Sequence, residues 1–329
     1  MAHGSGLDAQ LGVGVESTYG TRVAPSTFLP FESESLSLTQ EYIANQPLMS
    51  GVMVQPEGYH VSSTRSVEGS IEMLLHDRGM GKILNLLTGS TVTPATPAGA
   101  TNARTQTFPI GLTSPVGKSV SIQVGRPDTS GTVRPFDYLG AKITEATIAV
   151  EAGEAATLSL SVDARDEKTD QTLATPTYSA SAKPYGFKNW SITVGGSAAA
   201  NVRSLTITVP LGMAVDRYHL GNSGVKDEPL LNAQSEIAVS ATLEFASLAD
   251  HNRFRNESVV ALVATAQNAL IESTHYYSTT ITVPAAKQVS SNPVVAGPDL
   301  VTSDVEFRAL WNGTDAPLTI VNKNTDTSL

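Results

Sequence analysis

Apolar and polar residues alternate with a period of two in many short runs along the 329-residue chain. Alternation of this kind is typical of β strands that bury one face. It predicts eleven strands, five in the first half of the chain and six in the second. They span residues 35–38, 67–73, 120–124, 143–150, 156–162, 191–194, 204–209, 237–245, 280–283, 305–310 and 317–321. Turn-forming residues at 152–154 and 312–313 fit tight connections between neighbouring strands.

Helical periodicity is much rarer than strand alternation. Residues 76–88 can place Ile83, Leu84 and Leu87 on one face, and Gly89 follows as a stop signal. Residues 248–256 form a second candidate, which is short and charged. The chain is therefore predicted to be mainly β, with one short helix flanking the strands of each half.

The strand pattern of the first half returns in the second half. Residues 35–38 match 204–207 at an offset of 169, and the alternation of 67–73 matches 237–243 at an offset of 170. Two later matches have offsets of 159 and 160, because the first half carries an extra loop after its helix. They place Ile122 and Val124 on Ile281 and Val283, and Gly153, Leu158 and Leu160 on Gly313, Leu318 and Ile320.

This repetition predicts two tandem copies of one β fold. The first copy would comprise residues 1–168 and the second residues 183–329. Residues 169–182 are polar and contain one proline, as expected for a linker between the copies.

Three long stretches without strand alternation lie between the predicted elements. Residues 40–65 connect two strands of the first half, and residues 210–234 occupy the equivalent place in the second half. Long connections of this kind usually carry a function or an interaction. Residues 90–117 are rich in Thr, Pro and Ala, which predicts a loop excursion at the surface.

Composition narrows the possible functions. Charged residues make up 16% of the chain, while 34 Ser and 36 Thr favour strands and turns. The absence of cysteine excludes disulfides, thiolate nucleophiles and cysteine-ligated metals. The formal net charge is −10 without a basic patch, which argues against a protein that grips nucleic-acid phosphates.

The chain shows no signal for export or for a membrane anchor. Its N-terminus lacks a basic segment followed by an apolar run. The longest apolar stretch is residues 259–264, far short of the roughly 20 residues that span a bilayer. We therefore expect synthesis in a cytoplasm.

Motifs that carry chemistry are missing or incomplete. The six histidines have no metal-ligand spacing, and no nucleophile-elbow motif exists. The Gly79–Lys82 stretch lacks the first glycine and the Ser or Thr of a phosphate-binding loop. Gly12 and Gly14 resemble the start of a dinucleotide fingerprint, but no strand precedes them, and a flexible N-terminal turn explains them better. We therefore predict no catalytic, cofactor-binding or metal-binding residues, and no enzymatic activity.

The N-terminal residues resemble a known family. The block GLDAQLGVG at residues 6–14, the block ESTYG at 16–20 and the block FLPFESES at 28–35 are similar to the major tail tube proteins of bacteriophages with long, non-contractile tails. The longer type found among phages of actinobacteria is the most similar. Later segments follow in the family's order, namely GSIEM at 69–73, LLTG at 86–89, PYGF at 184–187, ITVGG at 192–196 and ALWNG at 309–313.

This resemblance implies a β sandwich or barrel that assembles into stacked rings. The rings would form the hollow tail tube of a virion, and the phage genome would pass through the tube without specific binding. Implied partners are copies of the chain itself and other tail proteins, namely the tape measure, tail terminator and distal tail proteins. The resemblance implies no cofactor, and it places the protein in the virion tail after synthesis in the bacterial host.

In such proteins the early long connection reaches the adjacent ring, which maps here to residues 40–65. Its candidate contact residues are Gln46, Leu48, Met49, Val52, Val54, Tyr59 and His60. If each chain holds two copies of the fold, three chains would make a pseudo-sixfold ring. The alternatives are a decoration or adhesin module that binds host glycans, and a β-sandwich hydrolase whose carboxylates cannot be identified from one sequence.

Overall fold

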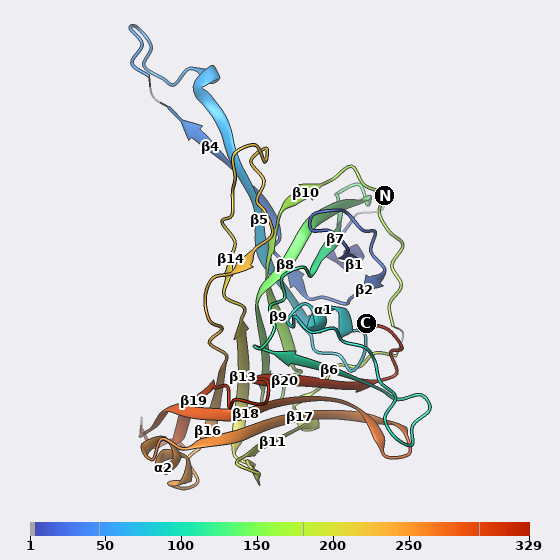
Figure 1. Cartoon of the computed structure of the whole chain (residues 1–329), viewed down its shortest axis with the longest axis vertical. Coiled ribbons are helices and arrows are strands. Elements are labelled where there is room, and N and C mark those ends of the chain that lie inside the picture. The colour runs from blue at the N-terminus through green and yellow to red at the C-terminus, as the bar shows by residue number, and fades with distance from the viewer. Residues whose placement is uncertain (1–3, 46, 180, 296) are drawn as a thin grey trace.

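The computed structural model describes residues 4–45, 47–179, 181–295 and 297–329. The protein is mainly β, as the alternation predicts, and its described strands form large antiparallel sheets without closing into a barrel (Figure 1). One hydrophobic core contains residues from both halves of the chain.

The described residues of the first half form ten strands. In hydrogen-bonding order its main strands run β1, β7, β8, β9, β5 and β4. The strands are β1 (Gln10–Glu16), β2 (Thr27–Phe28), β3 (Ser33–Glu34), β4 (Ser37–Ala44), β5 (His60–Leu74), β6 (Arg104–Ile110), β7 (Ser119–Pro127), β8 (Val133–Glu151), β9 (Thr157–Ala164) and β10 (Asp166–Lys168).

Ten strands likewise lie in the described part of the second half. Its main strands run β11, β17, β18, β19, β16 and β13 in hydrogen-bonding order. The strands are β11 (Trp190–Val194), β12 (Ser197–Ala198), β13 (Val202–Pro210), β14 (Met213–Ala214), β15 (Leu230–Leu231), β16 (Ala238–Glu244), β17 (Val259–Glu272), β18 (His275–Val294), β19 (Thr302–Ala309) and β20 (Leu318–Asn324).

Each half contains one unusually long strand that is shared between two sheet regions. The first part of β8 pairs with β7, and its second part pairs with β9 from Lys142 onward, with a register shift between Ile143 and Glu145. In the same way, β18 pairs first with β17 and then with β19, with a register shift between Gln288 and Ser290. Bulges of this kind bend a strand and increase its twist, which lets one strand serve both regions.

Two strand pairs join the halves. Strand β13 lies antiparallel to β8, from Ser204 opposite Glu151 to Pro210 opposite Glu145. Strand β6, from the first half, pairs with β20 of the second half over seven residues. The segment 169–182 also contacts the first half, because Gln123 donates to Thr172 O at 3.1 Å and accepts from Ala174 N at 2.8 Å.

Each of the eleven predicted strands overlaps a strand of the structure, but two of the predicted loops were wrong in part. Residues 40–65 are largely a β hairpin made by β4 and β5. Residues 90–117 are not entirely a surface excursion, because they contain β6. Strands β1 and β17 were also missed by the alternation.

The predicted helix at 76–88 is shorter than expected. Helix α1 spans only Gly81–Asn85, whereas α2 spans Ala249–Arg255, close to the predicted 248–256. Residues before α1 are held out of the helix by distant contacts. Gly79 has a left-handed φ of 79°, and its N–H donates to Asp326 at 2.7 Å instead of to a carbonyl within the helix.

The explanation of Gly12 and Gly14 by a flexible turn was wrong. Both lie in β1, which is almost wholly buried. A Cβ on Gly14 would lie 2.6 Å from the carbonyl oxygen of Val23, and a Cβ on Gly12 would lie 2.7 Å from Pro25 Cβ. The glycines therefore allow the segment that leads into β2 to cross closely over β1.

Candidate assembly surfaces

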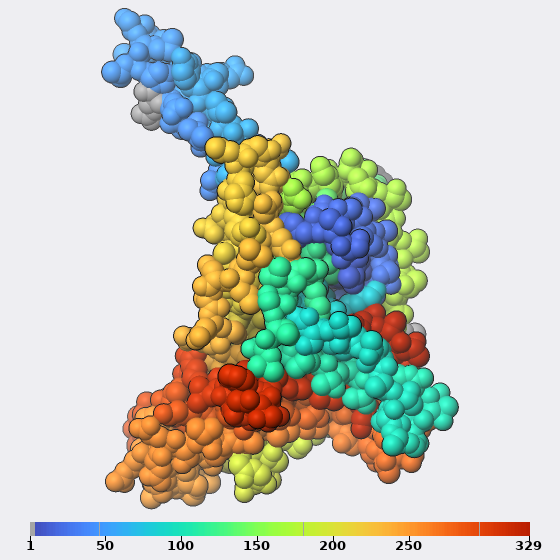
Figure 2. Space-filling model, in the orientation of Figure 1, coloured from blue at the N-terminus to red at the C-terminus, as the bar shows by residue number. Residues whose placement is uncertain are grey.

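The most prominent surface feature is a two-stranded hairpin that projects from the body of the molecule. It comprises β4, β5 and the connecting residues 45–59, which we call the hairpin tip (Figures 1 and 2). Beyond Leu38 opposite Val67, the pairing continues to Ala44 opposite His60. All eight residues of β4 are exposed.

The hairpin tip is apolar and uncovered. Leu48 and Met53 are fully exposed, and Val54 is 78% exposed. Scattered single apolar residues are ordinary on protein surfaces, whereas an exposed group of neighbouring apolar residues is typical of contact sites.

The structure places most of the predicted contact residues on this hairpin. Leu48, Met49, Val52, Val54 and Tyr59 are exposed in the tip. His60, which begins β5, is exposed and stacks on Tyr42 with ring centroids 4.6 Å apart. Gln46 lies outside the described residues.

Four further apolar residues share this exposure and were missed in the sequence: Tyr42, Ile43, Met53 and Val61. The prediction of a loop at residues 40–65 did not include two strands whose side chains are exposed to solvent. The signal was present, because apolar residues stand here without the polar alternation that a half-buried strand shows.

The equivalent connection of the second half behaves differently. Residues 211–236 lie beside the base of the hairpin in Figure 1, where Arg65 N donates to Gly224 O at 2.9 Å. Two ion pairs tie this segment to the first half, Lys226 with Asp163 and Lys142 with Glu228. Burial raises the pKa of Asp163 to about 6 and lowers the pKa of Lys142.

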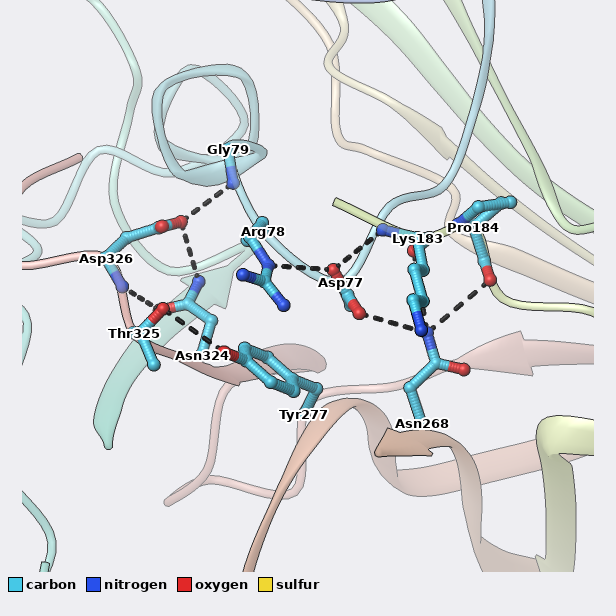
Figure 3. A network of polar contacts seen from close by, with 10 residues as sticks. All are labelled: Asp77, Arg78, Gly79, Lys183, Pro184, Asn268, Tyr277, Asn324, Thr325 and Asp326. Atoms are coloured by element: carbon cyan, nitrogen blue, oxygen red, sulfur yellow. Dashed lines mark hydrogen bonds and ion pairs between the residues drawn. The ribbon is translucent and has the colours of Figure 1, made fainter. Parts of the chain in front are cut away.

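A polar network joins the two halves on another side (Figure 3). Asp77 accepts hydrogen bonds from Arg78 Nε at 3.2 Å, from Lys183 N at 3.0 Å and from Asn268 Nδ2 at 3.2 Å. It thus connects the end of β5, the end of the linker and β17. A carboxylate with three donors is well satisfied, which suits a structural role.

The same network reaches the C-terminal segment. Asp326 accepts from Gly79 N at 2.7 Å and from Asn324 Nδ2 at 3.0 Å, and burial raises its pKa. The Arg78 guanidinium lies 4.1 Å from the centroid of the Tyr277 ring. The hydrogen bond from Gly79 to Asp326 holds the segment that follows β20 against the first half.

Within the described residues, no group of three or more His, Asp or Glu side chains could hold a metal ion. Buried Glu16 accepts hydrogen bonds from Ser119 Oγ at 2.7 Å and Ser121 Oγ at 2.8 Å, and also from Gly20 N and Gly140 N. These donors belong to neighbouring strands and loops, which Glu16 holds together.

One hollow of the surface, of about 480 Å³, is lined by Glu68, Glu145 and Asp163 among others. Two further hollows are mainly apolar. One of about 710 Å³ lies between the loop after β6 and the loop after β19, and it is lined by Leu112, Leu310 and Trp311 among others. Another of about 480 Å³ lies beside α2 and opens onto Leu205 and Phe307. Neither holds the convergent polar groups that orient a substrate.

Among the described helices, none has both the length and the apolar character needed to cross a membrane. The comparison with curated proteins finds no match. A family model described as phage tail tube protein matches residues 6–309 of the 329. This match extends over nearly the whole chain, from before β1 to the end of β19. The chain therefore belongs to the phage tail tube protein family.

Proposed function

We propose that this chain assembles with copies of itself into stacked rings, which form the hollow tube that delivers the phage genome. The observation that carries the proposal is the hairpin with its fully exposed Leu48 and Met53. In a monomer this apolar surface stays in water, whereas a neighbouring subunit would remove it at a gain of roughly 25 cal/mol per Å².

The hairpin tip is proposed to contact the adjacent ring. Its length supports this role, because it extends away from the body that the rest of the chain forms (Figure 2). A protruding element that docks on a different surface of the next copy makes a heterologous contact, and repetition of such contacts generates a filament.

We also propose that the two halves are copies of one fold, and that three chains make a pseudo-sixfold ring. The strand order β1, β7, β8, β9, β5, β4 parallels the order β11, β17, β18, β19, β16, β13. In this order, β7 corresponds to β17 and β9 to β19. The sequence offsets of 159 and 160 had matched β7 with β18 and β9 with β20, which is one strand too late.

The positions of the bulges support the same correspondence. The irregularity between Ile143 and Glu145 of β8 has its counterpart between Gln288 and Ser290 of β18, at an offset of 145 for both residues. A second irregularity precedes each one, where Ala141 and Ala286, again 145 apart, pair with β7 and β17. Chance similarity of short strands does not account for two shared interruptions.

The proposed partners follow from the family. Other tail components, namely the tape measure, tail terminator and distal tail proteins, would cap or fill the tube. Passing DNA would not be bound specifically, because a net charge of −10 opposes attraction of a polyanion.

Electron microscopy of the purified protein in negative stain, with a mass measurement over a range of concentrations, tests the proposal. We expect rings and hollow tubes to form as the concentration rises. A chain that remains a monomer at all concentrations contradicts the proposal and favours a decoration or adhesin module.

A further inference from the structure

We propose that the side chains of Lys226 and Asp163 condense into an amide bond, which ties residues 211–236 covalently to β9. The reaction takes place within one chain and needs neither a ligand nor a neighbouring copy. The inference is therefore independent of the proposed function.

The two side chains form the most deeply buried ion pair of the described residues. Lys226 Nζ donates to Asp163 Oδ1, and the side chains are only 1% and 3% exposed. In every other ion pair of the described residues, at least one side chain is 16% exposed or more. Water is thus largely excluded from this pair.

Burial favours the protonation states that an amide bond requires. An ammonium ion is not a nucleophile and a carboxylate is a poor electrophile, so a solvated pair does not react. Charges are disfavoured where water is excluded, and transfer of one proton from Nζ to the carboxylate leaves both groups neutral. In agreement with this, desolvation raises the pKa of Asp163 to about 6. The neutral amine and the neutral carboxylic acid are therefore accessible within the pair.

The second carboxyl oxygen is placed to leave. Asp163 Oδ2 is buried and has no hydrogen-bond partner within the part of the chain that the structure describes. A buried acceptor without a partner is costly in a purely structural ion pair. Asp163 also belongs to the lining of the hollow of about 480 Å³ that contains Glu68. This hollow offers a route by which a water molecule departs.

Glu68 lies where it can carry a proton. It is directly opposite Asp163 in the pairing of β5 with β9, so the two side chains project from the same face of the sheet. The Cβ atoms of such pairs are about 4.5–5.5 Å apart. After desolvation and the contact with Lys226, the negative charge of Glu68 is a further influence on the pKa of Asp163, which it raises. Glu68 is itself exposed, so it can exchange protons with water in the hollow.

The reaction balances without a co-reactant. Nζ of Lys226 attacks Cγ of Asp163, the N–C bond forms, and the bond between Cγ and Oδ2 breaks. Of the three ammonium protons, one stays on the amide nitrogen and two leave with Oδ2 as water, one of them by way of Glu68. Nothing is oxidised or reduced. Groups held in contact in this way have effective concentrations of roughly 10⁵–10⁸ M when they are well oriented.

The neighbouring pair of Lys142 and Glu228 provides a comparison within the same chain. Glu228 is 21% exposed, and its Oε1 also accepts from Gly117 N at 2.6 Å. Lys142 Nζ also donates to Pro115 O at 3.2 Å. Additional hydrogen bonds stabilise the charged forms, so we expect this second pair to remain an ion pair.

The amide bond would close a large loop of the chain. Asp163 and Lys226 are 63 positions apart. The residues between them include the linker and β13, whose pairing with β8 joins the halves. A covalent closure removes conformational entropy from the unfolded chain. It would also hold the two halves together when the pairing of β13 with β8 opens.

Intact-mass spectrometry of the natural chain, purified after folding, tests the proposal. Almost all molecules should be lighter than their sequence specifies by the mass of one water molecule, and the difference should persist in denaturant. The full sequence mass in the folded protein overturns the proposal.

A tryptic digest locates the bond. Trypsin does not cleave after an amidated lysine, so residues 143–165 should remain attached to residues 218–253. The double variant Asp163→Leu, Lys226→Met replaces the ion pair by apolar side chains, which buried sites often accept. It should show the full sequence mass and separate peptides. Loss of a water molecule from this variant as well would place the modification elsewhere and contradict the proposal.

Glu68→Gln tests the proton transfer, and Glu145→Gln is its matched control. Both residues line the hollow, but Glu145 lies opposite Ser161 instead of Asp163. The loss of water is followed by mass over time after cell-free synthesis. Glu68→Gln should slow it at least tenfold, whereas Glu145→Gln should keep the natural rate. Equal rates in the two variants overturn the role of Glu68.

Discussion

At the scale of single residues, small side chains decide how closely the N-terminal strand is covered. Gly14→Ala would bring a Cβ to 2.6 Å from Val23 O, so the backbone of the crossing segment has to move. We expect a loss of roughly 1–3 kcal/mol in the free energy of unfolding, as for other overpacked sites. Urea denaturation of the monomer measures this loss.

Gly6→Ala is the matched control for this prediction. A Cβ on Gly6 meets no atom within 4 Å, and the expected change is within about 0.5 kcal/mol. Equal stabilities of the two variants would show that the crossing over β1 is looser than the structure indicates.

At the scale of elements, we expect substitutions in the hairpin tip to weaken assembly without changing the stability of the monomer. Replacing Leu48, Met53 and Val54 by serine removes apolar side chains that contact little in the monomer. We expect nearly unchanged stability but a critical concentration for tube formation raised on the order of 100-fold, from about 1 kcal/mol for each side chain that a neighbour buries. Sedimentation of tubes over a concentration series measures the effect.

The control keeps the hairpin tip apolar. Leu48→Met, Met53→Leu and Val54→Ile preserve its character and should assemble at close to the natural concentration. If the serine variant forms tubes at the natural concentration, the hairpin tip does not contribute to the contact between rings.

At the scale of the whole molecule, the repeated strand order predicts the composition of a ring. Three chains of 34.5 kDa give a ring of about 104 kDa with six similar lobes and three projecting hairpins. Mass measurement of single rings together with an image reconstruction tests this prediction. Six chains in each ring, at about 207 kDa, would contradict it.

The sequence predicted the strands that bury one face, because alternation is a local property of an extended backbone. It missed β1, which is buried on both faces and in which Leu11, Val13 and Val15 alternate with glycines instead of with polar residues. It also missed β6, whose pairing with β20 joins residues more than 200 positions apart. The helix at 76–88 was shortened by contacts with Lys183 and Asp326, which no local pattern of residues 76–80 encodes.

For the assembly surfaces, the sequence by itself determined that the chain is mainly β and that it carries apolar residues between 42 and 61. The tertiary structure decided that these residues form a projecting hairpin, whereas the equivalent residues 211–236 fold back on the first half. It also decided which strand edges stay open. Composition and periodicity act within a few residues, whereas register, bulges and open edges arise from the pairing of distant strands.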